Sequence, residues 1–282
     1  MVVTLISQLY HLLKYEFEQS STKFEKGMLI ISIDIDVGNR KVGLANESKN
    51  DANVHNYLAE YEVGAIEETA LPLFVDLFDH FHVPVTFAVR GQLLDVEKAA
   101  MAPILKASVK HDIGSHGYSH KSFKGLSRNE AEMELNMTSR IMEKLNIVPK
   151  SFVFPKNMVA HLDLLEEYGY KCYREYGDFI RDGMYIEKRG QLYDIHPSLY
   201  LDQNTNYIPL KKILDICVHK KLPFHVWFHL WDFGQERRLI QKAIRRIFFP
   251  FLGYAKGKAN EAELTFETML SAIERAQACA CS

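Results

Sequence analysis

The chain has 282 residues, 47% of them hydrophobic, which is enough to build the core of one large α/β domain or two small ones. Its formal net charge is only -2 at pH 7, so no strong field would attract nucleic acid or an anionic membrane. The four cysteines lack the spacing of a metal knuckle or a disulfide framework, and this favours a reducing, cytoplasmic location. No apolar run reaches the roughly 20 residues that would span a bilayer.

The first residues, MVVTLISQLYHLL, have neither the positively charged start nor the cleavage site of a signal peptide. Their periodicity predicts an amphipathic helix instead. We expect Leu5, Leu9, Leu12 and Leu13 to share its apolar face.

Short apolar runs alternate with helical patterns along most of the chain. The predicted strands are residues 28–34, 84–89, 111–116, 151–154, 170–174, 191–196 and 224–229. Helices are predicted at 67–81 and at 127–145, the latter opened by a capping box of Ser127 and Glu130. This alternation is typical of parallel strands joined by crossover helices, as in a (β/α) barrel or an open doubly wound sheet.

No linker or repeat divides the sequence, so we expect one domain over residues 1–282. It would consist of an N-terminal helix in 1–26, a central barrel in 27–232 and C-terminal helices in 233–282. The helical patterns of that tail cover 235–249 and 260–276. The polar segment 37–60 is long for a loop and is interpreted as a lid or as structure without a clear pattern.

Two histidines four residues apart, His116 and His120, follow the predicted strand 111–116. Side chains with this spacing share one face of a helical turn, so two imidazoles can bind one cation. Chance alone would also produce such a pair, and His225 and His229 have the same spacing. His116 lies at the end of a predicted strand, and Gly114 and Gly117 allow unusual backbone dihedrals or close approach, which favours a functional site there.

Two carboxylates end the aliphatic strand LIISIDID. Asp34 and Asp36 point the same way, because alternate residues of a strand share a face. Burying two like charges together is costly unless a cation or a hydrogen-bond donor compensates. A divalent ion held by His116, His120 and one aspartate would do so, and two imidazoles with one carboxylate match a catalytic zinc site. Iron, cobalt and manganese would fit almost as well.

Four motifs together, SIDID, SHGYSH, FVFPKN and WFHLWDF, resemble those of the polysaccharide deacetylase family, the NodB-homology carbohydrate esterases. The resemblance covers roughly residues 27–232. It implies an irregular seven-stranded (β/α) barrel and a metal-dependent deacetylase of N-acetylated sugars, usually with zinc. It further implies that Asp34 is the general base, that Asp36, His116 and His120 bind the metal, and that His229 is the general acid.

Three positions depart from the pattern of that family. Ile35 separates two aspartates that are usually adjacent, and Val153 stands where the family has an arginine two residues before Pro155. Lys156 is one candidate for the missing positive charge, although a lysine lacks the planar fork of an arginine. Asp194 and Asp232 are both candidates for the carboxylate that tunes His229.

The resulting hypothesis is a hydrolase acting on the amide C–N bond of an acetylated sugar. A metal-activated water would attack, Asp34 would take its proton, and His229 would protonate the leaving nitrogen. Two alternatives remain, a hydrolase of another non-peptide C–N bond, similar to allantoinase, and a non-catalytic carbohydrate-binding barrel. The sequence carries no signal for an oligomeric state. The residues expected to contact substrate or its oxyanion are Pro155, Lys156, Asn157, Trp227 and Trp231.

Overall fold

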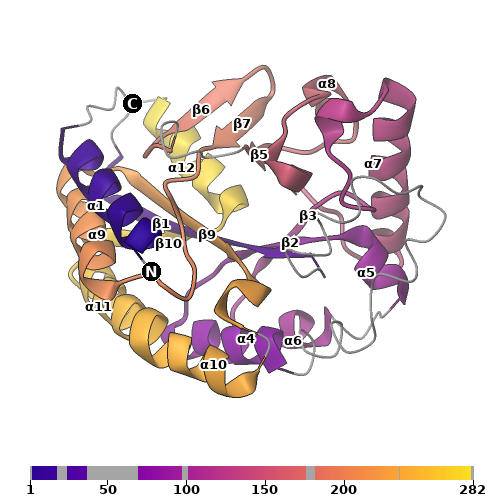
Figure 1. Cartoon of the computed structure of the whole chain (residues 1–282). Coiled ribbons are helices and arrows are strands. Elements are labelled where there is room, and N and C mark those ends of the chain that lie inside the picture. Colours follow the sequence, from indigo (N-terminus) through magenta and orange to yellow (C-terminus); the bar gives the residue numbers. More distant parts are fainter. Residues whose placement is uncertain are drawn as a thin grey trace.

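One mixed sheet of ten strands runs through the molecule (Figure 1). The computed structural model describes residues 2–17, 24–36, 69–96, 101–175, 182–234 and 236–280, so the predicted segment 37–60 lies outside the described residues. The strands are β1 (Gly27–Ile35), β2 (Thr86–Val89), β3 (Asp112–Ser115), β4 (Ser151–Val153), β5 (Cys172–Arg174), β6 (Ile186–Arg189), β7 (Leu192–Ile195), β8 (Leu199–Tyr200), β9 (Pro223–His229) and β10 (Leu264–Glu267).

Helices flank both faces of this sheet (Figure 1). The α-helices are α1 (Val2–Phe17), α4 (Leu71–Phe81), α5 (Gly91–Val96), α6 (Ala102–Leu105), α7 (Arg128–Glu143), α8 (Leu162–Glu167), α9 (Tyr207–Lys220), α10 (Arg237–Ala243), α11 (Phe249–Asn260) and α12 (Met269–Ala280). Short 3-10 turns lie at Phe123–Gly125, Pro155–Asn157 and Leu230–Phe233, and a π-helical turn at Ile244–Phe248 joins α10 to α11. The predicted capping box of Ser127 and Glu130 begins α7.

The sheet is open and has ten strands, so the α/β class is confirmed, whereas the irregular seven-stranded barrel is a half-barrel with more strands. Its strand order is β6-β7-β5-β4-β3-β2-β1-β9-β8, with β10 paired to β1 outside this path. All pairs are parallel except β6 with β7. Among the described residues no pairing joins β6 to β8, so the curled sheet forms a half-barrel. The seven predicted strands are all present, and β6, β8 and β10 were not predicted.

The strand β10 corrects the helical prediction for residues 260–276. It pairs with the first half of β1, where Gly27 lies opposite Leu264, whereas β2 pairs with the second half. Its sequence, LTFE, has the β-branched and aromatic residues that suit a strand, but the surrounding Glu and Ala residues hide this short signal. The helix α12 begins only at Met269.

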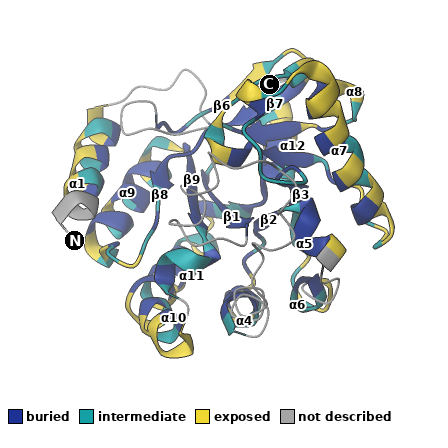
Figure 2. Ribbon diagram, turned by 45° about the vertical axis from the view of Figure 1, so that its right-hand side comes forward, coloured by how far each residue is buried: buried dark blue, intermediate teal, exposed yellow. Residues whose placement is uncertain are grey.

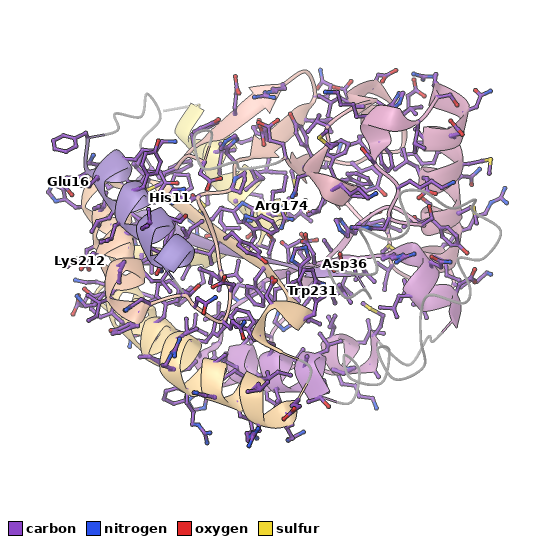
Figure 3. All side chains as sticks on the ribbon, in the orientation of Figure 1. His11, Glu16, Asp36, Arg174, Lys212 and Trp231 are labelled. Carbon is purple, nitrogen blue, oxygen red and sulfur yellow. The ribbon has the colours of Figure 1, made fainter. Side chains whose placement is uncertain are left out.

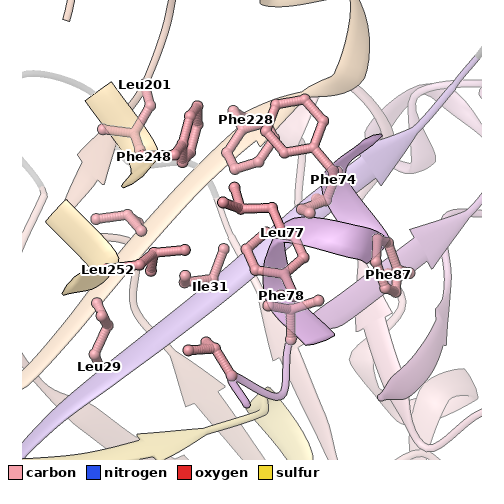
Figure 4. Packing of buried hydrophobic residues seen from close by; sticks show 14 of the residues in the cluster. Leu29, Ile31, Phe74, Leu77, Phe78, Phe87, Leu201, Phe228, Phe248 and Leu252 are labelled. Atoms are coloured by element: carbon pink, nitrogen blue, oxygen red, sulfur yellow. The ribbon is translucent and has the colours of Figure 1, made fainter. Parts of the chain in front are cut away.

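The central strand β1 separates two different environments. Its odd-numbered residues Leu29, Ile31, Ile33 and Ile35 belong to the large hydrophobic core, which contains buried residues of α4 and α11 (Figure 4). Its even-numbered residues Met28 and Ile30 belong to a smaller cluster on the other face, with Val153 and Cys172. Ser32 and Asp34 continue this second face. The inner face of the curled sheet therefore changes from apolar to polar toward the carboxyl end of β1.

Helix α1 is present as predicted, but its predicted apolar face is only partly correct, because Leu12 packs against the large core whereas Leu9 and Leu13 do not. Leu9 is 46% exposed and Leu13 63%, while Gln8, His11 and Tyr15 are buried. The ribbon of α1 accordingly has both exposed and less exposed parts (Figure 2). Hydrogen bonds explain this choice, because His11 Nε2 lies 2.8 Å from Asp182 Oδ2 and the Tyr15 hydroxyl donates to Ser198 O at 2.5 Å. No helix among the described residues is long and apolar enough to cross a membrane.

The docking of α1 can be tested by substitutions on its two faces. We expect Tyr15→Ala to lower the free energy of unfolding by about 3 kcal/mol, because it removes a buried ring and leaves a buried carbonyl unpaired. The matched substitution Leu13→Ala on the exposed face should change it by less than about 0.5 kcal/mol. Equilibrium urea unfolding measures both, and a larger effect at Leu13 would contradict the observed orientation.

Candidate active site

Titratable side chains gather at the carboxyl ends of the parallel strands. In the register of the sheet, Asp34 of β1 lies opposite His229 of β9. Asp36 follows β1 directly, and His116 follows β3. His120 comes four residues later and has a left-handed backbone, with φ of 64°. Since the ends of parallel strands share one edge of a sheet, these residues meet although they are far apart in sequence (Figure 3 labels Asp36).

Three of these side chains can hold a cation. One ligand atom from each of Asp36, His116 and His120 lies within 4.8 Å of the others. His120 Nε2 is 3.3 Å from Asp36 Oδ2, and the two imidazole rings are 4.9 Å apart. His116 Nδ1 donates to the carbonyl of Val153 at 2.8 Å, so its Nε2 is left as the ligand atom. Within the described residues, that buried Nε2 has no hydrogen-bond partner.

The protonation of these groups suits a metal. Burial lowers the pKa of His116 against the attraction of Asp34, and it lowers the pKa of His120 to about 3 against the attraction of Asp36. Burial raises the pKa of Asp36, but His229 and His120 outweigh it and lower that pKa overall. Neutral imidazoles with an ionised carboxylate are what a divalent transition metal requires, so the residues fit such an ion.

The Asp34 carboxylate is held by Arg174, a residue that the sequence reasoning missed. The Nη2 of Arg174 donates to Asp34 Oδ2 at 2.5 Å, and both side chains are almost completely buried. Burial would raise the pKa of Asp34, but Arg174, His116 and His229 lower it to about 2. Its other oxygen, Oδ1, has no hydrogen-bond partner among the described residues and is the free acceptor of this carboxylate.

Arg174 takes the place of the arginine that is absent at position 153, but it comes from the neighbouring strand β5. In the sheet register Val153 of β4 pairs with Arg174 of β5, so the two side chains point to the same face. The guanidinium also lies 4.3 Å from the ring centre of Trp227. Lys156, the sequence candidate for this charge, is exposed. An arginine at the end of the apolar strand YKCYR was the signal that could have found it.

A buried relay behind Asp34 fixes the guanidinium. Arg174 Nη1 donates to Ser32 Oγ at 2.7 Å, and Ser32 Oγ lies 2.8 Å from His225 Nε2. His225 Nδ1 faces the carbonyl of Ile195 at 3.0 Å and must donate to it, so Nε2 accepts the Ser32 hydrogen. Burial lowers the pKa of His225 to about 3, which agrees with a neutral ring. His225 is thus part of the support for Arg174.

His229 has the opposite electrostatic character. Its Nδ1 is 3.0 Å from Asp232 Oδ2, while its Nε2 lies 3.8 Å from Asp34 and 4.0 Å from Asp36. Burial lowers the pKa of His229, but Asp36, Asp232 and Asp34 together raise it to about 9. Of the two aspartates considered from the sequence, Asp232 contacts His229, and Asp194 contacts Arg189 and His196 instead. At neutral pH His229 is a cation that can give a proton from Nε2.

The remaining residues that the sequence suggested for substrate contact differ in how far they are buried. Trp231 donates from Nε1 to Asp36 Oδ1 at 3.1 Å, and both residues are labelled in Figure 3. Its ring also stacks on the His229 ring at 4.4 Å. Trp227 is only 5% exposed, so it offers little surface for a sugar. Its ring packs against the Arg174 guanidinium instead. Pro155 is buried, and the backbone N–H of Asn157 donates to Phe154 O at 2.9 Å. That N–H is therefore already engaged within its own turn.

Comparison with known proteins covers two of the four sequence motifs, SHGYSH and FVFPKN, and leaves out SIDID and WFHLWDF. Residues 45–172, less than half of the chain, match the sequence model of the polysaccharide deacetylase family. A peptidoglycan deacetylase of Helicobacter pylori is 26% identical over 107 residues, which are 37% of this chain and 36% of that relative. The match thus spans about a third of the curated relative. The resemblance to polysaccharide deacetylases is confirmed.

Two solved structures share the fold. A protein described as a polysaccharide deacetylase, from Mycobacterium smegmatis, superposes with a TM-score of 0.68 at 18% identity and covers 93% of each chain. Puue allantoinase superposes with a TM-score of 0.67 at 15% identity and covers 95% of this chain and 96% of its own. At these identities the structures establish the common fold.

The predicted ligand set can be tested by zinc affinity. We expect His120→Ala to weaken the tightest zinc binding by a hundredfold or more, since one of three protein ligands is lost. The control is His219→Ala, at an exposed histidine of α9, which should leave the affinity unchanged. Competition with a chromophoric chelator measures both. An unchanged affinity in His120→Ala would exclude this ligand set.

Proposed function

We propose that this chain is a metal-dependent hydrolase that removes the acetyl group from an N-acetylated sugar. The observation that carries the proposal is the joint placement of the Asp36, His116 and His120 ligand atoms beside a buried carboxylate and a cationic imidazole. Asp34 and His229 supply the basic and acidic groups that amide hydrolysis needs. The cytoplasmic location expected from the cysteine content stays a prediction.

The chain's own residues divide the reaction between them. When bound, a divalent ion, with zinc the expected one, lowers the pKa of a coordinated water and polarises the acetyl carbonyl. Asp34 would accept a proton from the attacking water. Its Oδ2, which Arg174 holds, is the oxygen that lies 4.0 Å from His116 Nε2 and 3.8 Å from His229 Nε2. His229 Nε2 donates a proton to the departing sugar nitrogen, and Asp232 holds the ring from the other side.

The runner-up is hydrolysis of another non-peptide C–N bond, as in an allantoinase. The similarity to Puue allantoinase over nearly the whole of both chains favours keeping it under test. The same acid and base groups would serve either amide, so the substrate decides between the two functions.

Release of acetate tests the proposal directly. We expect purified protein to release acetate from peptidoglycan fragments or from soluble N-acetylated sugar precursors, and chelation to abolish the release until zinc is restored. Asp34→Asn should keep the zinc and lower kcat by about 100-fold or more, because it removes the proton acceptor. Hydrolysis of allantoin without any acetate release from sugars would favour the alternative function.

The pKa of His229 predicts the alkaline limit of activity. In the metal-free protein this pKa is raised to about 9, so His229 carries the required proton at neutral pH and loses it at alkaline pH. An ion bound to Asp36 would cancel part of that attraction and move the loss to lower pH. Asp232→Asn removes one of the charges that raise this pKa, so we expect the alkaline limb of kcat/KM to move down by about one pH unit. Zinc content is the control, and an unchanged limb would exclude His229 as the acid.

The positioning role of Arg174 can be tested by exchanging cross-strand partners. We expect Arg174→Val to lower kcat by about 100-fold and to destabilise the protein by about 3–5 kcal/mol, because the buried Asp34 charge loses its partner. The double substitution Arg174→Val with Val153→Arg returns a guanidinium to the paired position on the same face. The double variant should recover part of the lost kcat and part of the lost stability. Val153→Arg alone should not raise the activity. No recovery in the double variant would contradict the exchange.

A further inference from the structure

We propose that Glu175, Asp194 and His196 bind a second divalent transition-metal ion, at a site separate from the one described above. The proposal rests on the positions of their ligand atoms and on a buried carboxylate that accepts no hydrogen bond within the described part of the chain. Metal content can be measured without any substrate, so the proposal does not depend on the proposed function.

The three residues meet on the outer face of the sheet at neighbouring strands. Glu175 follows β5, Asp194 lies in β7, and His196 comes directly after β7, which pairs with β5. Arg174, the residue before Glu175, points to Asp34 on the inner face (labelled in Figure 3). Alternation along the strand sends Glu175 to the opposite side, so the two candidate sites flank the end of β5.

The separations match those of ligands around one ion. His196 Nδ1 lies 3.4 Å from Glu175 Oε1 and 3.6 Å from Asp194 Oδ2. Two ligands at about 2.1 Å from a zinc ion, at a tetrahedral angle, are about 3.4 Å apart. One ligand atom from each of the three residues lies within 4.8 Å of the others. An imidazole with two carboxylates suits zinc, manganese or iron.

Asp194 supplies the second, independent observation. It is completely buried, and within the described residues neither of its carboxylate oxygens has a hydrogen-bond partner. Native proteins rarely leave a buried carboxylate in that state. Burial and the charge of Asp194 raise the pKa of Glu175, which records the repulsion between the two carboxylates. A divalent cation between them would relieve it.

One cation is already close, but its charge does not balance the cluster. Arg189 of β6 lies 3.4 Å from Asp194 Oδ2 and 3.4 Å from Glu175 Oε2, and at 3.0 Å it also contacts Glu187. Its single positive charge thus faces three carboxylates. The side chain is 38% exposed, so it can move outward when an ion enters.

The imidazole is oriented as in known metal sites. His196 Nε2 is 3.0 Å from the hydroxyl of Tyr185, and the two rings stack at 4.2 Å with an angle of 19°. A hydrogen bond at Nε2 fixes the ring and directs Nδ1 to the two carboxylates. An ion bound there would tie β5 to β7 directly beside Arg174.

Zinc stoichiometry in single-site variants tests the proposal. The full chain is stripped with chelator, loaded with Zn²⁺, passed over a desalting column and analysed for metal by mass spectrometry. We expect two equivalents in the natural sequence, one in His116→Ala, one in Asp194→Asn and none in the double variant. Glu187→Gln, which changes a carboxylate of the same cluster outside the ligand set, should keep two.

A second measurement guards against misfolding and adventitious zinc. In the His116→Ala background, Zn²⁺ at about 100 times its Kd should raise Tm by about 5 °C or more, and adding the conservative His196→Gln should remove the shift. If His116→Ala retains no zinc after desalting, or if its zinc and Tm shift persist when His196→Gln is added, the second site does not exist. Loss of acetate release with both sites intact would instead contradict the proposed function alone.

Discussion

The ion pair of Asp34 and Arg174 is the interaction on which the rest of the site depends. Asp34 is 2% exposed, and an isolated carboxylate at that depth would neutralise itself or unfold the strand end. The guanidinium binds one oxygen and keeps the charge, so the other oxygen remains an acceptor. The imidazole of His229 and the three candidate metal ligands lie around this fixed negative charge.

The support for that ion pair explains why the inner face of the sheet is polar at one end only. Ser32, His225 and Trp227 contact Arg174 directly or through one hydrogen bond, and each comes from β1 or β9. The outer face of the same strand, from Leu29 to Ile35, packs in the large core (Figure 4). Close packing of this apolar face restricts the movement of β1, and so it also fixes the positions of Ser32 and Asp34 on the opposite face.

The sequence predicted much of the site because local patterns carried it. The alternation in LIISIDID predicted the common face of Asp34 and Asp36. His116 and His120 do come together, but the helical turn that their spacing suggested is absent, and the chain between them bends with left-handed backbone at Gly117 and His120. The partners that join across strands were harder to predict. Arg174 was missed because its role depends on the register between β4 and β5, which one sequence does not encode locally.

The errors in the fold have similar physical causes. The strand β10 is four residues long and lies between helical patterns, so its pairing with β1 is a tertiary effect. In α1 the leucine periodicity predicted the buried face, but hydrogen bonds of His11 and Tyr15 to distant segments determined it. The alternation of strands and helices could not predict whether the sheet closes into a barrel, because open and closed sheets have the same alternation.

The most direct test of the account is a crystal structure of the zinc-loaded protein with anomalous scattering at the zinc edge. We predict an anomalous peak about 2.0–2.2 Å from Asp36 Oδ, His116 Nε2 and His120 Nε2, with Arg174 still bound to Asp34. The absence of zinc at these three atoms, or an Asp34 carboxylate separated from Arg174, would contradict the central claim.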